Sequence, residues 1–468
     1  MITNSDRECR FHNQQYIKND FRTKFEHDYD RVIYSSYLRR LANVTQIFNP
    51  SEGVIFHNRL THTLKVSQVA IRIAQKILRS RKYPKKDLLN VGGLDCDVVS
   101  TAALAHDLGN PPFGHAAESE LNRLIMKDGI LDGFEGNAQS FRIVTRLATH
   151  NGKYPGLDLT KASLNALLKY PYKKERESQK KFGAYSTEYE YFNFARTLTP
   201  YLNKKKCLEA SIMDISDDIT YGIHDLLDLL RQGLLPFRLI SETSDELSKN
   251  GEKAYRTTKS YPDFSRTFNI IDTLSKDNYH EEWAPNWHNN RKEIIKKVAL
   301  FFKRFDLLFD DPNYEGFKEE RVLFKNIEDF FLNGFIASVQ INLHPSDDQN
   351  VLFLDDDAAD TLIILKAITK SFIVNSTSLI KQQCGERKIV KQLYEAFKEA
   401  ISDEDLRVIL PARTREELVI QKIKDSKNPI GIRLITDAIS GLTDSEAISS
   451  YYVLSGIQPG SIFDRISL

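Results

Sequence analysis

The chain lacks the features of a membrane protein and of a disulfide-bonded secreted domain. Its four cysteines stand far apart and form no CxxC pair, which excludes a zinc knuckle and a disulfide framework. No run of about 18 apolar residues occurs, and the N-terminal stretch MITNSDRECRFHNQQ lacks the apolar core of a signal peptide. We therefore expect a protein of the reducing cytoplasm that makes no membrane contact.

An excess of one sign of charge is also missing. The 65 Lys and Arg residues balance 64 Asp and Glu residues, and the formal net charge is only +1. A nucleic-acid-coating or membrane-surface protein usually carries a stronger bias. Two charged runs, SRKYPKKD (80–87) and YKKERESQKKFG (172–183), are interpreted as solvated loops. Single-stranded nucleic acid is therefore not a predicted partner.

Alternating strand-like stretches are scarce, and helical periodicity prevails. VLFLD (351–355) has some character of a strand. Elsewhere apolar residues recur three or four positions apart, which is typical of helices that bury one face. These stretches are 66–78, 98–108, 138–148, 217–230, 362–375 and 388–401. With 41% hydrophobic and 28% charged residues, the chain is predicted to have a globular all-α fold with little or no sheet.

The length permits two or three average domains or one continuous helical body. We expect residues 1–240 to form a catalytic core that includes an N-terminal substrate-binding segment. Residues 241–468 are predicted to form a C-terminal helical region. This region would pack on the core and complete the substrate pocket or an oligomer interface.

Two segments place histidine and aspartate at buried positions of predicted helices. His62 begins a helix, and Arg59 lies three residues earlier on the same face. His106 and Asp107 end an apolar helix, because the residues GNPPFG that follow cannot continue it. Adjacent residues diverge by about 100° on a regular helix, so both can reach one ion only near a helix end. Since unpaired polar groups are costly in apolar helices, the pattern favours metal ligands.

A third segment adds carboxylates along one helix. Asp217, Tyr221 and Asp225 follow each other at four-residue steps and so share one helical stripe. We predict Asp217 as the fourth ligand because this choice leaves the other two on the same stripe, and Asp218 is the alternative. Two imidazoles and two carboxylates suit one divalent ion, Mn or Mg first, with Fe, Co, Ni and Zn as further candidates. Such an ion acidifies water and offsets phosphoryl charge, which predicts phosphoester hydrolysis.

These ligands resemble the H...HD...D signature of the HD-superfamily phosphohydrolases, and the motifs around them narrow the resemblance. The motifs are HNRLTHTLKV (57–66), HDLGNPPFGHAAE (106–118), FEGNAQSFR (134–142), DDITYGIHDLLD (217–228) and GLTD (441–444). Together they resemble the bacterial dGTP triphosphohydrolases from about residue 22 to 445. That family cleaves a dNTP at the α-phosphorus and releases nucleoside and intact triphosphate. The resemblance implies an HD-domain helical bundle that hydrolyses deoxynucleoside triphosphates, with dGTP favoured.

The resemblance also implies roles outside the metal sphere. His115 and Glu118 correspond to the family's catalytic histidine and acid, and an imidazole beside a carboxylate is a common proton donor to a leaving oxygen. Gln46 and Asp225 correspond to positions that hydrogen-bond the sugar 3′-hydroxyl. Tyr221 corresponds to the position that packs on the deoxyribose and excludes ribonucleotides.

Phosphate binding and assembly follow from the same resemblance. Arg59, Lys169 and Tyr170 correspond to phosphate-binding positions, and Arg433 is a less specific candidate for the same role. The run 172–183 after LLKYPY matches no motif, and GLTD varies the usual GMTD, which leaves the C-terminal substrate contacts open. Family members commonly form homo-oligomers, built from dimers and up to hexamers, so self-association is expected.

Two rival functions remain. The chain could be an HD-superfamily phosphohydrolase of another nucleotide phosphoester, which analysis of the products separates from the first function. It could instead be a non-catalytic nucleotide- or nucleic-acid-binding regulator with a vestigial site. That rival expects missing ligands, and none of the four is missing from the sequence.

Overall fold

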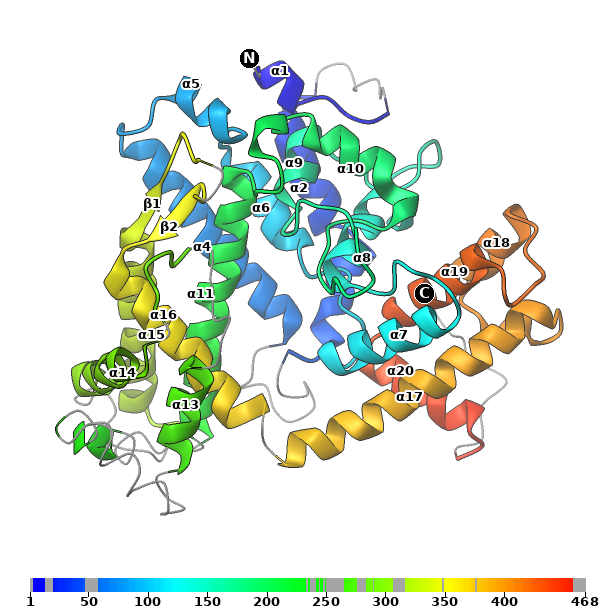
Figure 1. Ribbon diagram of the computed structural model, residues 1–468. Coiled ribbons are helices and arrows are strands. Elements are labelled where there is room, and N and C mark those ends of the chain that lie inside the picture. Colours follow the sequence, from blue (N-terminus) through cyan, green and yellow to red (C-terminus); the bar gives the residue numbers. More distant parts are fainter. Residues whose placement is uncertain are drawn as a thin grey trace. The chain divides into compact units, whose positions relative to one another are not determined.

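The protein is almost entirely helical in the part of the chain that its computed structural model describes (Figure 1). The described residues are 3–12, 20–46, 58–232, 235, 241–243, 245–246, 249, 265–275, 283–288, 290–305, 316–346, 349–374 and 377–457. His57, the first residue of the motif HNRLTHTLKV, lies outside them. The expected all-α fold is confirmed.

Each stretch with helical periodicity forms a helix. They are α4 (Arg59–Arg79), α6 (Cys96–Ala105), α8 (Gly136–Arg142) with the π-helical turn η4 (Ile143–Leu147), α11 (Leu208–Arg231), α16 (Asp356–Thr369) with the π-helical turn η9 (Lys370–Val374), and α17 (Thr377–Ser402). The further α-helices are α1 (Asn4–Arg7), α2 (Lys24–Ile33), α3 (Ser36–Arg40), α5 (Lys85–Leu88), α7 (His115–Lys127), α9 (Lys161–Ala166), α10 (Tyr189–Arg196), α13 (Ser265–Ser275), α14 (Arg291–Phe305), α15 (Lys318–Ser338), α18 (Ala412–Ile420), α19 (Pro429–Ser440) and α20 (Asp444–Leu454). Short 3-10 turns are η1 (Leu41–Asn43), η3 (Leu89–Val91), η5 (Ser186–Glu188), η6 (Pro200–Leu202) and η10 (Leu406–Ile409).

One small antiparallel sheet occurs within the described ranges. It consists of β1 (Val339–Ile341) and β2 (Leu352–Leu354), with Gln340 opposite Phe353. The sequence VLFLD therefore does form a strand.

The chain folds into two compact units. Unit 1 comprises Met1–Asp214 and Lys381–Leu468, and unit 2 comprises Ile215–Ile380. Helix α11 begins in unit 1 and continues into unit 2. The boundary expected at residue 240 separates the predicted catalytic core from the predicted C-terminal region. These two units do not test which residues build the catalytic core, so that boundary stays a prediction.

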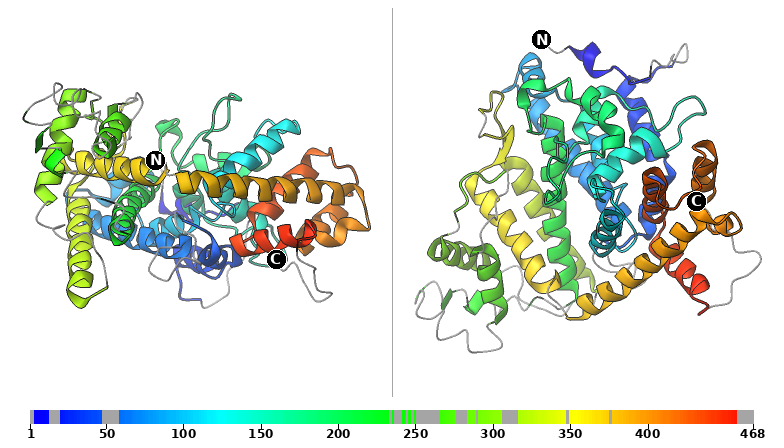
Figure 2. Two further views of the ribbon diagram at one scale, coloured as in Figure 1. Left: turned by 90° about the horizontal axis from the view of Figure 1, so that it is seen from below. Right: turned by 45° about the vertical axis from the view of Figure 1, so that its right-hand side comes forward.

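Helices α4 and α6 pack together in unit 1 and position the candidate site (Figures 1 and 2). Asn58 caps α4 by accepting a hydrogen bond from the N–H of Thr61, which fixes where this 21-residue helix begins. The buried face of α4 is formed by Val66, Val69, Ala70, Ile73 and Ile77. In α6 every residue from 98 to 105 is buried, and most of them are small, so the two helices approach closely.

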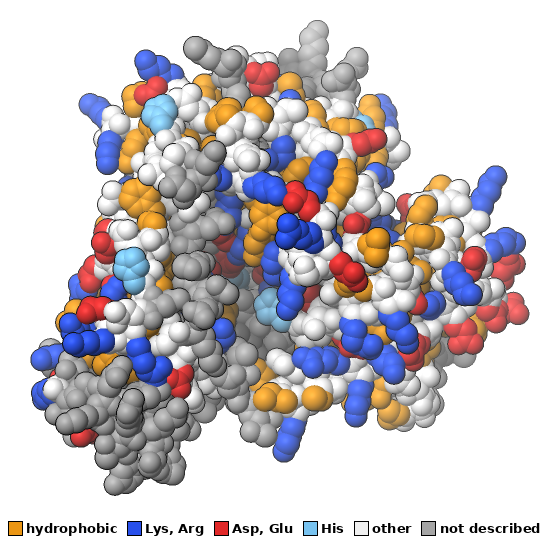
Figure 3. All heavy atoms as spheres, in the orientation of Figure 1, with side chains coloured by type: hydrophobic (Ala, Val, Ile, Leu, Met, Phe, Trp, Pro, Cys, Tyr) orange, Lys and Arg blue, Asp and Glu red, His pale blue; other side chains and the backbone are white. Residues whose placement is uncertain are grey.

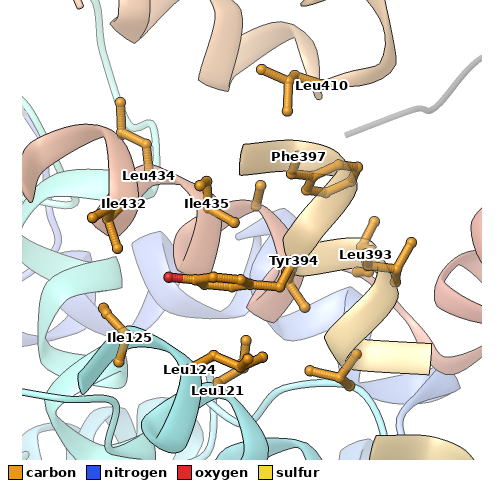
Figure 4. Packing of buried hydrophobic residues seen from close by; sticks show 14 of the residues in the cluster. Leu121, Leu124, Ile125, Leu393, Tyr394, Phe397, Leu410, Ile432, Leu434 and Ile435 are labelled. Carbon is orange, nitrogen blue, oxygen red and sulfur yellow. The ribbon is translucent and has the colours of Figure 1, made fainter. Parts of the chain in front are cut away.

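A second core of unit 1 joins α7, α17 and α19. Figure 4 shows Tyr394 of α17 among leucines and isoleucines of the two other helices. Its hydroxyl donates a 2.8 Å hydrogen bond to Asp128, which satisfies the polar end of a buried ring. Each fully buried Leu, Ile or Phe of such a core contributes about 1.5–3 kcal/mol. Helices α17 and α19 are thereby fixed to the helix that carries His115 and Glu118.

The surface of unit 1 agrees with the near-zero net charge. Around α7 and α17, Lys and Arg side chains are interspersed with Asp and Glu (Figure 3). Lys398 pairs with Asp128 at 2.6 Å as one example.

One stretch, Lys85–Ala105, is long and apolar enough to cross a membrane by length and composition alone. It contains three successive helices, α5, η3 and α6, and 67% of its apolar window is buried inside the protein. Core helices commonly pass this test, so the stretch is weak support for a membrane span.

In unit 2, α16 contacts α13, α14 and α15 (Figures 1 and 2). Phenylalanines fill the space between α14 and α15, where the rings of Phe305 and Phe331 lie 4.9 Å apart. The two helices of this aromatic core contain none of the motifs named above.

Candidate active site

His62, His106 and Asp107 form a cluster that could hold a metal ion. Their candidate ligand atoms all lie within 4.8 Å of one another, and the two imidazole rings are 6.2 Å apart between centroids. His62 comes from the first turn of α4, and the other two come from the end of α6. Both histidines are buried, and Asp107 is half-buried. The structure thus brings together three of the four predicted ligands within unit 1.

The end of α6 orients His106. The helix stops at Ala105, and Nδ1 of His106 lies 2.7 Å from the carbonyl oxygen of Ala103. This contact assigns the N–H to Nδ1 and leaves the lone pair on Nε2, as in many metal-binding histidines. Ser140 of α8 fixes the same turn, because its hydroxyl donates to the carbonyl of His106 at 2.7 Å and accepts from the N–H of Gly109 at 2.9 Å.

Close approach of α8 requires glycine in the HD turn. A Cβ at Gly109 would lie 2.3 Å from the carbonyl oxygen of Gly136 and 2.3 Å from the backbone nitrogen of Ser140. These distances are impossible between non-bonded atoms. The motifs HDLGN and FEGNAQSFR therefore depend on each other for the geometry of the turn.

Two side chains hold the carboxylate of Asp107. Nη1 of Arg59 donates to Oδ2 at 2.6 Å, and Nδ2 of Asn110 donates to Oδ1 at 2.5 Å. Arg59 is buried, and its Nη2 also donates to the carbonyl of Thr45 at 3.2 Å. Arg59, a predicted phosphate-binding residue, thus lies directly at the metal cluster.

His115 and Glu118 form a hydrogen-bonded pair beside this cluster. Nδ1 of His115 lies 2.8 Å from Oε2 of Glu118, and the side chains are 86% and 13% exposed. The preceding turn needs a left-handed backbone, with φ of 63° at Phe113 and 58° at Gly114. A Cβ at Gly114 would lie 3.3 Å from Nη2 of Arg59, so the pair starts next to the metal cluster.

A second contact joins the pair to the metal cluster. A Cβ at Gly136 would lie 3.0 Å from Oδ1 of Asn110 and 3.8 Å from Oε1 of Glu118. Asn110 is the residue that holds the carboxylate of Asp107. The His115–Glu118 pair therefore lies near the residues that hold Asp107.

Lys181 is a site residue that the sequence analysis missed. Its Nζ lies 3.2 Å from Oε1 of Glu118 and 2.9 Å from Oε1 of the buried Glu135. The interpretation of the run 172–183 as a solvated loop is wrong at this end, because Lys181 and the buried Phe182 pack into unit 1. The signal in the sequence is Phe182, an apolar aromatic residue directly after Lys180 and Lys181, which indicates a segment that packs on the core.

Electrostatics at this point favour an ionised Glu118. Burial opposes ionisation, but the hydrogen bond from His115 and the charge of Lys181 lower the pKa of Glu118 to about 2. Burial raises the pKa of Glu135, against the opposing charge of Lys181. The ammonium of Lys181 therefore neutralises a pair of neighbouring acids.

The predicted phosphate-binding lysine lies in a second cationic group. Nζ of Lys169 lies 2.8 Å from Oδ1 of Asp214, and Lys206 binds the other oxygen of the same carboxylate. Burial opposes ionisation of Asp214, but the two ammonium groups lower its pKa. Burial raises the pKa of the neighbouring Tyr170, which lies near Lys169 and Lys181. Lys206 and Asp214 lay outside the motifs that the sequence analysis used.

Arg433 lies deeper than the other predicted phosphate-binding residues. Its guanidinium stacks on the ring of Tyr185, 3.7 Å from the centroid, and Nη1 donates to the carbonyl of Gly133 at 2.9 Å. Its role in phosphate binding stays a prediction. The contacts show that it stabilises the position of Tyr185 and of the backbone at Gly133.

Three of the predicted residues lie on the part of α11 in unit 2. Asp217 and Tyr221 are half-buried, and Asp225 is buried. Asp218 accepts a hydrogen bond from Nε1 of Trp283 at 2.8 Å and pairs with Lys366 at 3.1 Å. Because Asp218 serves packing within unit 2, Asp217 remains our predicted fourth ligand.

Gln46 and Asp225 each have a buried atom that the described residues do not satisfy. Within those ranges, Oε1 of Gln46 and Oδ2 of Asp225 have no hydrogen-bond partner. Burial raises the pKa of Asp225 well above its usual value, Asp228 adds to this shift, and hydrogen bonds from Tyr221 and Thr369 oppose it. Buried polar atoms without a protein partner commonly bond to water or to a ligand.

A cavity of about 820 Å³ in unit 1 lies away from this chemistry. It is lined by α3, the loop 146–156, α18 and α19, and none of its lining residues is a predicted site residue. Two of its arginines are engaged, since Arg146 pairs with Glu188 and Arg413 donates to the backbone of Arg146. The candidate site is therefore assigned from the side chains described above and not from this cavity.

Two known domain families match this chain, one in its first half and one toward its C-terminal end. The HD domain matches residues 59–222, which include every residue of the metal cluster. The phosphohydrolase-associated domain matches residues 352–452.

Individual relatives extend the match over nearly the whole chain. The deoxyguanosinetriphosphate triphosphohydrolase-like protein of Streptomyces coelicolor is 38% identical over 456 residues, which cover 93% of each chain. Similar proteins of the same description occur in Vibrio cholerae, 29% identical over 91% of this chain and 86% of that one, and in Bifidobacterium longum, 28% identical over 93% and 84%. The chain therefore belongs to the HD-domain phosphohydrolases, in the family of deoxyguanosinetriphosphate triphosphohydrolase-like proteins.

Proposed function

We propose that this protein hydrolyses deoxynucleoside triphosphates, with dGTP favoured, to deoxynucleoside and inorganic triphosphate. The observation that carries the proposal is the position of the His115–Glu118 pair near the cluster of His62, His106 and Asp107. The names of the relatives support a triphosphate substrate. In the proposed reaction, the bond between the α-phosphorus and the 5′-oxygen breaks, and water supplies the new oxygen on phosphorus.

The donor set fits one divalent cation. Two imidazoles and a carboxylate converge within 4.8 Å, and Nε2 of His106 is the nitrogen left to bind it. We propose Asp217 as the fourth ligand and Mn or Mg as the ion, since mixed nitrogen and oxygen donors accept both and also accept Fe, Co, Ni or Zn. When bound, such an ion acidifies water and offsets phosphoryl charge.

We assign proton transfer to His115. A hydrogen bond of 2.8 Å joins its Nδ1 to Glu118, so Nε2 is the nitrogen available to protonate the leaving 5′-oxygen. The ionised Glu118 fixes the orientation of the ring and stabilises its charged form. The high exposure of His115 allows a substrate to reach it.

Substrate contacts complete the proposal. Gln46 and Asp225 would hydrogen-bond the 3′-hydroxyl, and each has a buried oxygen that awaits a partner within the described ranges. Tyr221 would pack on the deoxyribose and exclude a 2′-hydroxyl. Arg59 and Lys169 would form ion pairs with phosphate oxygens, and the hydroxyl of Tyr170 would donate a hydrogen bond to them. Arg433 would be a further phosphate ligand.

Product analysis in heavy-oxygen water tests the reaction. Purified protein loaded with Mn is incubated with each dNTP and rNTP, and nucleoside, triphosphate, pyrophosphate and phosphate are resolved. We expect intact triphosphate that carries one heavy oxygen and nucleoside that carries none. Pyrophosphate or phosphate as the first product, or turnover of a monophosphate alone, would indicate another phosphoester as substrate. Binding of nucleotide without any turnover would indicate a regulator.

A further inference from the structure

Lys181 joins two acidic side chains from different elements. Glu118 lies on α7, and Glu135 precedes α8 as its N-cap, where its Oε2 accepts from the N–H of Ala138 at 2.9 Å. The side chains of Glu118 and Glu135 are 13% and 1% exposed, whereas that of Lys181 is 41% exposed. The lysine therefore approaches a buried acid pair from the solvent side.

We propose that Lys181 is a positioning residue that keeps Glu118 ionised and aligned with His115. This inference rests on the proposed function, because it concerns the acid–base pair of that reaction. Lys181 contacts Glu118 through Oε1, whereas His115 binds Oε2. One carboxylate is thus fixed from both sides, and the lysine acts through it.

The ammonium of Lys181 changes the charge balance around Glu118. Glu118 faces His115 on its own helix, Lys181 and Glu135 on neighbouring elements, and the N–H of Gly136 at 3.2 Å. Without Lys181, the carboxylate of Glu118 loses a positive neighbour while Glu135 stays beside it, so the pKa of Glu118 rises and this group binds a proton at higher pH. A protonated Glu118 no longer stabilises a charged imidazole.

Glu135 and Tyr170 complete the surroundings of the lysine. Nδ2 of Asn137 donates to Oε1 of Glu135 at 2.8 Å, the same oxygen that Lys181 contacts. The negative charges of Glu135 and Glu118 raise the pKa of Lys181 against the effect of burial, and Tyr170 adds to them. The lysine therefore stays charged over the pH range in which the protein is folded.

The test uses the Mn-loaded enzyme and its dNTP turnover from acidic to alkaline pH. In Lys181→Met, we expect the acidic limb of the kcat profile to move to higher pH by about one unit or more, with KM little changed. Lys181→Arg retains the charge and should keep the limb near its original position. The matched control is Lys180→Met, because Lys180 is the exposed neighbour in the same loop. Melting temperatures exclude variants that do not fold.

A double variant separates positioning from substrate contact. In a Glu118→Gln background, Lys181→Met should cause no further shift of the acidic limb, because the group through which it acts is gone. A raised KM with an unmoved pH profile in Lys181→Met would overturn the inference, as would equal effects with and without Glu118.

A spectroscopic readout is independent of turnover. Protein labelled with ¹³C at histidine Cε1 and loaded with Mg is titrated, and His115→Gln assigns the His115 resonance. We expect this resonance in Lys181→Met to show an added inflection from Glu118 that the wild type lacks over the same pH range. If the wild type hydrolyses no dNTP, the proposed function fails, yet this titration still decides the role of Lys181. Identical titrations of both proteins would refute it.

Discussion

The backbone N–H of Phe113 donates a 2.9 Å hydrogen bond to Oδ1 of Asp444, although 331 positions separate the two residues. The other oxygen of this carboxylate accepts from the N–H of Thr45, also at 2.9 Å. Thr45 directly precedes Gln46, and Phe113 lies two residues before His115. One buried carboxylate in the GLTD motif therefore fixes the backbone of two segments that carry proposed substrate-binding and catalytic residues.

Replacement of Asp444 by asparagine should reduce both stability and activity. The amide keeps one acceptor and directs its NH₂ group at a backbone donor, so at least one hydrogen bond to a charged group is lost. Such a loss in a buried position costs about 2–3 kcal/mol. We expect this decrease in the free energy of unfolding by urea, together with a lower kcat/KM for the dNTP.

The control for this change lies on the same helix. Glu446→Gln affects only the capping box of α20, where Glu446 accepts from the N–H of Thr443 at 2.8 Å. Loss of a cap costs about 1 kcal/mol. Equal effects of Asp444→Asn and Glu446→Gln would show that Asp444 acts only as part of the helix end.

Removal of His106 should abolish metal binding and turnover together. His106→Ala eliminates one imidazole of a three-residue cluster, and we expect metal affinity to fall by about 100-fold or more. Calorimetric titration of the apoprotein with Mn measures this affinity, and dNTP hydrolysis is followed in parallel. His150→Ala is a suitable control because His150 is exposed and absent from the cluster. A His106→Ala protein that retains turnover would contradict the assignment.

The sequence was sufficient to locate the metal cluster for a specific physical reason. Apolar helices are interrupted by His62, His106 and Asp107. The end of the second helix is also visible in the sequence, because prolines and glycines follow it. Their candidate ligand atoms lie within 4.8 Å of one another, and their role as metal ligands stays a prediction. The fold class followed from the same periodicity, since buried helical faces repeat every three or four residues.

Contacts between distant segments could not be predicted in this way. Lys181 lies in a lysine-rich run, where no periodicity separates an ammonium that pairs with buried acids from its exposed neighbours. Asp444 has an acidic side chain at a helix start, and its role is visible only when Thr45 and Phe113 converge on it. The return of residues 381–468 to unit 1 is likewise a tertiary property.

A local acidic cluster predicts a pH-dependent stability. Burial and the charges of Asp95, Glu26 and Asp30 raise the pKa of Asp97 from 3.8 to about 6. The folded protein then binds more protons than the unfolded chain between these values, so its stability falls as pH rises through this range. Because Asp97 is partly exposed, we expect Asp97→Asn to stabilise the protein by only about 1 kcal/mol above pH 7, after allowance for solvent screening.

Urea unfolding at several pH values tests this prediction. The variant and the wild type should have similar stability at about pH 3 or below, under both pKa values, where Asp97 is protonated in both states of the wild type. Their stabilities should diverge as pH rises and then run parallel above the upper value. A variant that is less stable than the wild type at neutral pH would refute the assigned shift.

Tyr221 offers a test of sugar selection by the proposed enzyme. Its hydroxyl binds Asp225 on the same helix, and its ring is proposed to occupy the space that a 2′-hydroxyl would need. Tyr221→Ala should therefore lower the ratio of kcat/KM for dGTP over GTP by about tenfold or more, since discrimination by shape depends on the filled volume. Tyr221→Phe keeps the ring and loses the hydrogen bond, so it should preserve the ratio while weakening any contact that Asp225 makes with the sugar. If the ratio in Tyr221→Ala equals that of the wild type, discrimination against ribonucleotides arises elsewhere.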